Sequence, residues 1–375
     1  MRYMLCAGEA SGDLHASELI RALRQKDSQA RFAFLGGDLM AEAAGSEPVI
    51  HYSQMAYMGF GDVVRHLPQV GRNLQVARSV LGRLRPDALI LVDYPSFNLR
   101  LAAEAEKEGI PVYYYISPKV WAWKEYRTAQ IARYCRRVLS ILPFEPKFYA
   151  DRGYGRCTYV GNPSVEEIDA RLSALTPEAL DAFRQENGLG TKPIIALVPG
   201  SRVSEIRSNL PVMLEAARVL ESKFQAVIAG APSIDRSLYD TRLPVVFGAT
   251  TTLMRSATAA LVTSGTASLE AALAGVPQVV CYRHSGSRAF YAVMSHVLKI
   301  PYVSLPNLIA GRDVVPELLL HRCTPLQVLR RLLDILPGHS GRAAQLDGYK
   351  LVRERLGRTH AAATAASIIV SDLKK

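Results

Sequence analysis

The chain has 375 residues, of which 49% are hydrophobic and 21% are charged, and its formal net charge is +11. This length accommodates two domains of ordinary size, and the five cysteines lack the paired spacing of a disulfide framework or a zinc site. No apolar run approaches the roughly 18–20 residues that span a bilayer, and no secretion signal precedes the first predicted strand. We therefore expect a globular cytoplasmic protein whose positive charge attracts a nucleic acid, a phosphorylated substrate or an acidic membrane surface.

Apolar runs typical of buried strands alternate along the chain with amphipathic helical patterns, as in parallel sheets that are covered by helices. In the first half, strands are predicted at residues 3–7, 31–35, 88–92, 112–116, 137–141 and 158–160. In the second half, they are predicted at residues 194–198, 225–229, 244–246, 259–263 and 278–281. Asn162-Pro163 places a domain boundary within residues 161–191, and the pattern after Gly341 is helical. Two Rossmann-like sheets are the simplest interpretation.

Carboxylates stand near two predicted strand ends in the first half. Gly8 and Gly12 flank the loop after the first strand and let a ligand approach the backbone closely. Asp38 follows the second strand, where dinucleotide-binding folds hold a ribose, but the glycine spacing is not the Gly-x-Gly-x-x-Gly of those folds. Asp93 follows the buried strand at residues 88–92, where a carboxylate serves either as a general base or as a cap for the next helix.

A second type of site is predicted within residues 262–280, where a strand leads through a hydroxyl-rich turn into an alanine-rich helix. A helix that begins near Ser264 or Gly265 leaves its first amide groups unpaired and partly positive, which favours an anion. Thr266 adds a hydroxyl, and Glu270, four residues later, lies on the same helix face. Because phosphate would repel this carboxylate, it suits the vicinal hydroxyls of a ribose. The alternative is an ordinary N-cap followed by a solvated glutamate.

The Ser264-Gly265-Thr266 turn, Glu270 and the Gly275-Val276-Pro277 exit resemble the donor-nucleotide signature of GT-B glycosyltransferases. Four further stretches, together with this one, resemble the lipid A disaccharide synthase family over nearly the whole chain. They are GEASGD at residues 8–13, SPKVWAW at 117–123, LVPGSR at 197–202 and YVSLPNLIAG at 302–311.

The resemblance implies an α/β fold of GT-B type, with two Rossmann-like domains whose parallel sheets face an interdomain cleft. Residues 1–165 would form an acceptor-binding and membrane-facing domain, completed by a C-terminal helix within residues 345–375, and residues 166–344 would bind the UDP-sugar donor. The implied reaction is inverting transfer of 2,3-diacylglucosamine from UDP to the 6-hydroxyl of 2,3-diacylglucosamine 1-phosphate. It yields a β-1,6-linked disaccharide 1-phosphate and UDP. Another GT-B UDP-sugar transferase or a UDP-sugar epimerase is the alternative.

Within this framework, the helix end at Gly265 is expected to hold the UDP diphosphate and Glu270 the ribose. Gly200, Ser201 and Arg202 follow the first strand of the second domain, at the edge where α/β sheets bind ligands. Arg202 is expected to contact phosphate oxygens as negative charge builds on the leaving UDP; a surface pair with Glu205 is the alternative.

Three further residues have roles that depend on the resemblance. Asn307 is expected to bind the donor, or else to serve as a turn or N-cap residue. For the inverting displacement Asp93 is the preferred general base, with Glu9 and Asp13 as rivals near the acceptor sugar. The sequence has no Asp-x-Asp motif and no His/Cys cluster, so neither a metal nor another cofactor is expected.

The acylated substrates implied by the resemblance predict contact with an anionic membrane at the inner face of the inner membrane. Residues 57–84 contain apolar side chains near helical spacing with arginines between them, which is typical either of an interfacial element or of a core-facing helix with a basic face. Trp121 and Trp123 are expected to pack in the cleft or to contact sugar or acyl chains. No nucleic-acid recognition motif is present in the sequence, and a monomer and a homodimer are both compatible with it.

Overall fold

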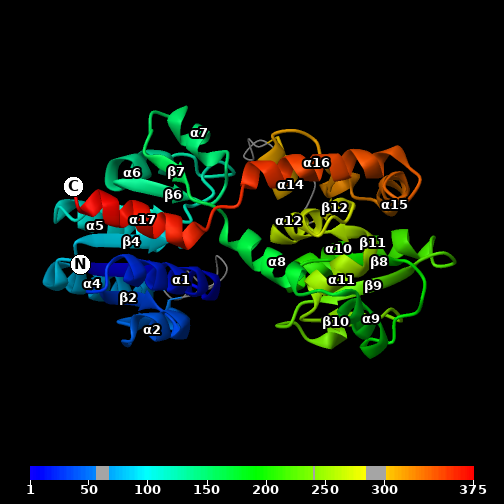
Figure 1. Cartoon of the computed structure of the whole chain (residues 1–375), viewed down its shortest axis with the longest axis horizontal. Helices are drawn as coiled ribbons and strands as arrows, with labels where there is room; N and C mark the ends of the chain where they lie inside the picture. The colour runs from blue at the N-terminus through cyan, green and yellow to red at the C-terminus, as the bar shows by residue number, and fades with distance from the viewer. Residues whose placement is uncertain (56–66, 240, 284–300) are drawn as a thin grey trace. The chain divides into compact units, whose positions relative to one another are not determined.

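The computed structural model describes residues 1–55, 67–239, 241–283 and 301–375. These residues form two compact units (Figure 1). Unit 1 consists of Met1–Pro163 and Arg358–Lys375, and unit 2 consists of Ser164–Gly357. Each unit is built around its own parallel sheet.

The sheet of unit 1 has seven parallel strands in the order β3-β2-β1-β4-β5-β6-β7. Their bounds are β1 Arg2–Ala7, β2 Arg31–Gly36, β3 Ile50–His51, β4 Ala88–Val92, β5 Val112–Tyr115, β6 Arg137–Ser140 and β7 Cys157–Tyr159. Every residue of β4, Ala-Leu-Ile-Leu-Val, is buried, because a parallel sheet is covered on both faces and its strands are therefore apolar throughout.

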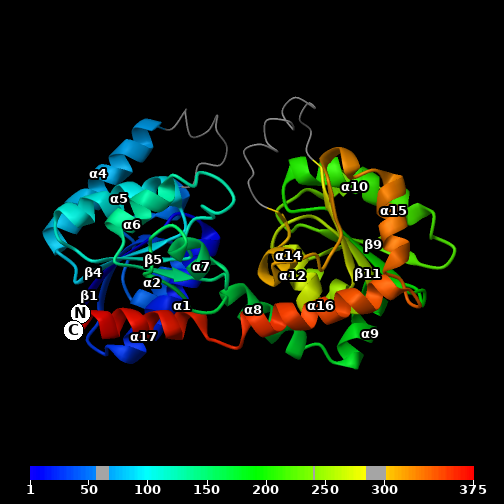
Figure 2. The ribbon, with the colours of Figure 1, turned by 90° about the horizontal axis from the view of Figure 1, so that it is seen from above.

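Helices cover both faces of this sheet (Figure 2). One face is covered by α1 Ala10–Lys26, α2 Asp38–Ala44 and α17 Ala361–Leu373. The other is covered by α4 Leu67–Leu84, α5 Pro95–Lys107, α6 Arg127–Tyr134 and α7 Glu145–Ala150. A short 3-10 helix, η1 Tyr52–Gln54, follows β3.

Helix α17 returns from the C-terminal end of the chain to complete the core of unit 1. Ala365, Ala366 and Ile369 are fully buried against β1 and α1, and Figure 1 shows α17 beside the blue N-terminal elements. Asp372 near its end accepts hydrogen bonds from the Nε and Nη2 atoms of Arg137 at 2.8 and 3.2 Å. The last helix is therefore part of the first unit.

The sheet of unit 2 has six parallel strands in the order β10-β9-β8-β11-β12-β13. Their bounds are β8 Ile194–Val198, β9 Gln225–Gly230, β10 Val245–Phe247, β11 Ala257–Val262, β12 Gln278–Tyr282 and β13 Glu317–Leu319. The surrounding helices are α8 Pro163–Ser173, α9 Pro177–Glu186, α10 Val203–Arg218, α11 Thr250–Ser256, α12 Thr266–Leu273, α14 Leu305–Ala310, α15 Pro325–Asp334 and α16 Ser340–Leu356, with η2 Arg236–Tyr239 and η3 Leu320–Arg322. Helices α10 and α15 cover one face, whereas α9, α11 and α12 cover the other.

The prediction of two Rossmann-like, parallel-sheet domains is confirmed. Within the predicted C-terminal range, residues 345–375, the rest of α16 belongs to unit 2 and α17 belongs to unit 1. Gln345 on α16 exchanges hydrogen bonds with the backbone of Gln278 on β12 at 2.8 and 3.0 Å, and the chain returns to unit 1 at Arg358.

The segment predicted to meet a membrane is described only in part, since residues 56–66 lie outside the described residues. In α4, Leu74, Ala77 and Leu81 pack into the core of unit 1, and the arginines at 72, 78 and 83 are exposed. This part of the segment is a core-facing helix with a basic face. No helix within the described ranges is both long and apolar enough to cross a membrane.

Candidate functional site

Two glycines expose bare backbone at neighbouring strand ends in unit 2. Strands β8 and β11 are paired at their carboxyl ends, where Val198 lies opposite Val262, so the loops that follow them emerge side by side. Gly200 and Gly265 in these loops both have φ of +128°, a conformation that side chains with a Cβ rarely adopt. A Cβ on Gly200 would lie 2.6 Å from Cβ of Glu205, whereas one on Gly265 would face open space. The open space at Gly265 leaves room for a ligand close to the backbone.

Arg202 lies at the start of α10 and is held loosely. Glu205 accepts hydrogen bonds from the backbone N–H groups of Ser201 and Arg202 at 3.0 and 3.3 Å, and its other oxygen is 3.2 Å from Nη1 of Arg202. The predicted surface pair is thus present. The Arg202 side chain is nevertheless 73% exposed, and an exposed pair of this kind contributes only about 0.2–1 kcal/mol. The guanidinium can therefore leave Glu205 for a phosphate.

The helix end at Gly265 is arranged around two hydrogen bonds. Ser264 Oγ donates to the carbonyl oxygen of Val303 at 2.9 Å, while Thr266 is exposed at the first turn of α12. Glu270, one turn further, is buried and accepts a hydrogen bond from the Thr251 hydroxyl on α11. The expected ribose-binding carboxylate is therefore not a solvated helix residue, because it is held in place by a second helix.

Asn209 was not anticipated from the sequence, although it links three strand ends. It is fully buried on α10; Nδ2 donates to the carbonyl of Pro199 and to Oγ1 of Thr263 at 3.1 and 3.2 Å, and Oδ1 accepts from the N–H of Arg283 at 2.8 Å. The available signal was a polar residue on the apolar face of a helix, since Asn209 lies between Ile206 and Met213 at helical spacing.

Asn307 holds its own loop. Its Oδ1 accepts from the N–H groups of Val314 and Val315 at 2.7 and 2.9 Å, and Nδ2 donates to the Val315 carbonyl and to Glu317, both at 2.9 Å. Glu317 also accepts from the backbone N–H groups of Val303 and Ser304 at 3.0 and 2.9 Å. The geometry therefore favours the turn-forming role of Asn307 over direct contact with the donor.

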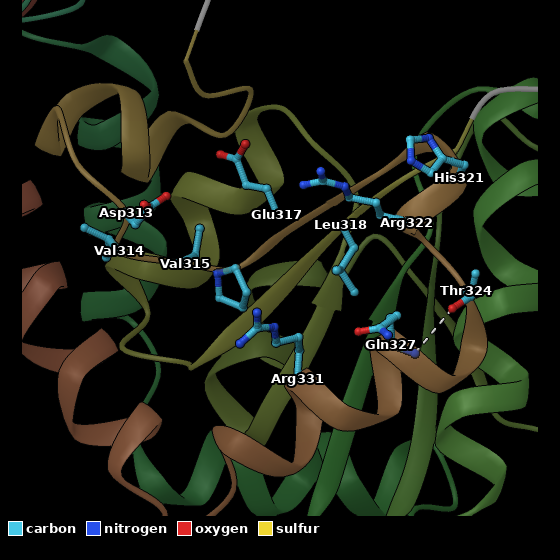
Figure 3. A pocket seen from close by; sticks show the side chains of 11 residues that line it. Asp313, Val314, Val315, Glu317, Leu318, His321, Arg322, Thr324, Gln327 and Arg331 are labelled. Carbon is cyan, nitrogen blue, oxygen red and sulfur yellow. Dashed lines mark hydrogen bonds between the residues drawn. The ribbon is translucent and has the colours of Figure 1, made fainter. Parts of the chain in front are cut away.

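A pocket lies beside the edge strand β13 (Figure 3). It is lined by residues 313–318, by His321 and Arg322, and by residues at the start and along one side of α15. Three of its lining residues, Val314, Val315 and Glu317, also belong to the hydrogen-bond network of residues 303–307. These lining residues all lie between Asp313 and Arg331, outside the glycine loops after β8 and β11.

In unit 1, Asp93 stands at the carboxyl end of β4 on an unusual backbone. Asp93 and Tyr94 have φ of +45° and +46°, a left-handed conformation that costs a non-glycine residue about 1–3 kcal/mol. The Asp93 carbonyl accepts from Nδ2 of Asn98 and from the Tyr114 hydroxyl, each at 2.7 Å, and its N–H donates to the Ile116 carbonyl at 3.2 Å. These three bonds hold the strained turn and so fix the carboxyl group.

Asp93 and Glu9 form a carboxyl pair. Burial, together with the nearby charge of Glu9 and a hydrogen bond shared with it, raises the pKa of Asp93 to about 6, against the opposing effect of the Lys119 charge. A carboxyl group whose pKa lies near 6 can accept a proton close to neutral pH.

Asp13 has a different role. Its Oδ1 accepts from the N–H of Gly37 at 2.6 Å and of Met40 at 3.3 Å, and its Oδ2 accepts from the N–H of Leu39 at 3.1 Å. It is buried and caps the N-terminus of α2, where a carboxylate is stabilised by unpaired amides. This geometry favours a structural role over the predicted role as a rival general base.

The two tryptophans differ in environment. Trp121 packs edge-on against Phe144 at 5.2 Å between ring centroids and donates its indole N–H to Glu145 at 3.0 Å. Trp123 is 51% exposed, with Nζ of Lys124 over its ring at 4.1 Å. Across the described part of the chain, no cluster of three or more His, Cys, Asp or Glu side chains suits a metal ion.

A family model described as lipid-A-disaccharide synthetase matches residues 3–369. The lipid-A-disaccharide synthase of Myxococcus xanthus is 40% identical over 381 residues, which covers 98% of this chain and 97% of that protein. That of Neisseria meningitidis serogroup A is 38% identical over 343 residues, covering 87% and 86%.

Solved structures share the fold at low identity. UDP-GlcNAc 2-epimerase from Neisseria meningitidis, bound to UDP-GlcNAc, is similar with a TM-score of 0.64 and 13% identity, covering 100% of both chains. The glycosyltransferase of kitacinnamycin has a TM-score of 0.61 and 15% identity, covering 99% of this chain and 98% of that one.

Proposed function

Because the chain belongs to the lipid-A-disaccharide synthase family and is therefore a glycosyltransferase, we propose that it joins two acylated glucosamine units. The donor is UDP-2,3-diacylglucosamine and the acceptor is 2,3-diacylglucosamine 1-phosphate. The acceptor 6-hydroxyl oxygen attacks the anomeric carbon of the donor and loses its proton to a base. The bond between that carbon and UDP breaks, its electron pair remains on the phosphate oxygen, and the anomeric configuration inverts.

We assign the donor nucleotide to unit 2. The observation that carries this assignment is the pair of adjacent loops in which Gly200 and Gly265 expose backbone, with Gly265 open to space at the start of α12. Amide groups at a helix start stabilise a diphosphate. Arg202, exposed and only loosely paired, adds a permanent charge as UDP departs, and Glu270 is assigned to the ribose hydroxyls.

We assign the general base to Asp93 in unit 1. Its raised pKa, about 6, leaves it ionised at neutral pH and yet basic enough to accept a proton during attack. Glu9 tunes this carboxyl group by sharing a hydrogen bond with it. Asp13 and Asn307 are assigned to positioning, because their polar atoms are used by the loops that they hold.

We propose peripheral contact with an anionic membrane, since the family acts in lipid A synthesis and the chain has a net charge of +11. Positive charge strengthens binding to anionic headgroups by roughly 1 kcal/mol for each nearby Lys or Arg. The exposed Trp123 suits the lipid–water boundary, where amphipathic rings gather. The protein would act at the inner face of the inner membrane as a monomer or a homodimer.

The decisive experiment follows UDP release and disaccharide formation with both acylated substrates. Arg202→Ala and Asp93→Asn should each lower kcat by about 10²-fold or more, since each removes a group that acts mainly in the transition state. Arg207→Ala is the matched control for Arg202, because it changes another exposed arginine of α10 and should leave turnover near wild type.

Two results would contradict the proposal. Release of UDP at the same rate without the acceptor would exclude transfer to a lipid sugar. Wild-type turnover by the Asp93 variant would move the base role to another carboxylate.

A further inference from the structure

Glu145 is a buried carboxyl group that the proposed reaction does not use. It is the first residue of α7 and is 1% exposed. One oxygen accepts the indole N–H of Trp121 at 3.0 Å, and the other is hydrogen-bonded to the hydroxyl of Ser140 at the end of β6. Ionising a buried carboxyl group whose hydrogen-bond donors are neutral costs free energy.

Burial has the largest effect on the titration of Glu145. Burial raises its pKa to about 7, while the bonds from Ser140 and Trp121 and the charge of Lys119 act in the opposite direction. The charge of Glu145 acts in turn on Tyr149, on its own helix, and on Cys157 of β7. Glu145 therefore changes its charge near neutral pH, inside the protein.

The loop between β5 and α6 connects Glu145 with Asp93. Ile116 at its start accepts the Asp93 N–H at 3.2 Å, and both Ile116 and Lys124 have left-handed φ values, of +57° and +55°. The Tyr149 hydroxyl on α7 contacts Oγ of Ser117 in the same loop at 3.4 Å. Helix α7 thus contacts this loop at two points, through Glu145 and through Tyr149.

Lys119 lies between these two contacts in sequence, and its charge acts on Asp93 and on Glu145 alike. Lys119 is itself exposed, so its position depends on the backbone that carries it. A loop with strained residues at both ends keeps one conformation only when its surroundings fix it. The Glu145–Trp121 bond supplies such a constraint two residues after Lys119.

We propose that Glu145 is a positioning residue, which fixes the indole of Trp121 and thereby holds Lys119 in place beside Asp93. This rests on the proposed role of Asp93 as the base. Ionised Glu145 also competes with Asp93 for the charge of Lys119. This competition begins only near pH 7, because the pKa of Glu145 is about 7 and that of Asp93 is about 6, so Glu145 is mostly protonated while Asp93 titrates.

The first test is spectroscopic and is independent of activity. The chain contains two tryptophans, so Trp123→Phe leaves Trp121 as the sole indole. Its fluorescence should change between about pH 6 and pH 8 as Glu145 ionises beside the indole N–H. Adding Glu145→Gln should abolish this transition. In the matched control Trp121→Phe, the fluorescence of the remaining Trp123 should not change in this way with pH.

The second test uses kinetics with both substrates. Glu145→Gln keeps an acceptor for the indole, so kcat should stay within about threefold of wild type. The acidic limb of the kcat/KM profile should stay in place, because Glu145 is already protonated where Asp93 titrates. Glu145→Ala removes the acceptor and should lower kcat about tenfold or more, with little change in the KM of the donor.

Stability separates these effects from misfolding. The folded protein holds a proton on Glu145 up to about pH 7, against an ordinary value of 4.5, so ionisation destabilises the fold progressively as the pH rises through that window. At pH 8, Glu145→Gln should therefore unfold at a urea concentration no lower than wild type.

The proposal is overturned if Trp121 fluorescence shows no Glu145-dependent transition, or if Glu145→Ala turns over like wild type. An active Asp93→Asn variant would instead refute the assigned base. The fluorescence titration would then still report on the Glu145–Trp121 contact.

Discussion

At the scale of single residues, Asp93 combines two unfavourable features at one position. Its backbone is left-handed, and its carboxyl group is largely buried beside a second carboxyl group. Structural residues are rarely kept in such a state, whereas groups that transfer protons often are, because strain and burial set both their position and their pKa. The reactivity of Asp93 therefore depends on its neighbours as much as on its own chemistry.

Glu9→Gln tests this dependence. The charge of Glu9 helps to raise the pKa of Asp93 to about 6, so removing that charge lowers the pKa, and Asp93 stays ionised to lower pH. The acidic limb of kcat/KM should move down by about one pH unit, and the plateau should fall because a weaker base accepts the proton. Initial rates between pH 4.5 and 8 measure both effects.

The matched control is Asp38→Asn, which neutralises an almost fully exposed carboxyl group elsewhere in unit 1. If the acidic limb of kcat/KM is unchanged in Glu9→Gln, the carboxyl groups of Glu9 and Asp93 do not interact.

At the scale of elements, a buried asparagine on a covering helix fixes the strand ends in each of the two units. Asn98 on α5 donates to the carbonyl oxygens of Cys6, Val92 and Asp93 at 3.3, 3.2 and 2.7 Å, and Asn209 on α10 links the ends of β8, β11 and β12. In each case a buried amide on a covering helix satisfies backbone groups that the sheet leaves unpaired.

Gly265→Ala tests the helix end of α12. A Cβ at φ +128° is strained, and it would occupy the open space proposed for the diphosphate. UDP affinity, measured by titration calorimetry, should fall at least about tenfold, because both the close approach and the backbone geometry are lost.

Gly338→Ala is the control for backbone strain, since Gly338 has φ +90° and equally open surroundings on an exposed loop. Equal UDP affinity in the two variants would show that the diphosphate does not bind at the start of α12.

The sequence predicts the strands better than the polar contacts. The eleven predicted strands match observed ones because continuous apolar runs identify buried strands directly, and β4 and β8 match residue for residue. The strands β3 and β13, of two and three residues, were missed. Asp93 and Arg202 could be singled out because they follow buried strands. The partners of Asp13, Asn307 and Asn209 could not be, because their amides and carbonyls come from other parts of the fold.

At the scale of the whole molecule, the integrity of unit 1 depends on α17. Deleting residues 358–375 removes Ile369 and Val370 from the core, whose burial alone contributes about 3–6 kcal/mol, and it breaks the Arg137–Asp372 pair. Hydrogen exchange should show loss of protection throughout residues 1–163, whereas the sheet of unit 2 and its UDP affinity should persist.

Removal of the exposed Lys374 and Lys375 alone should change neither property. Full protection of β1 and β4 in the longer deletion would show that unit 1 is complete without the helix.

The position of α17 also bears on how the protein is made. All of Ser164–Gly357 is synthesised between the two pieces of unit 1. Until translation reaches α17, the apolar side chains of α1 and β1 that α17 covers remain exposed. Exposed apolar surface of this kind is prone to aggregate. We expect unit 2 to fold first and the early segment to depend on chaperones until translation ends.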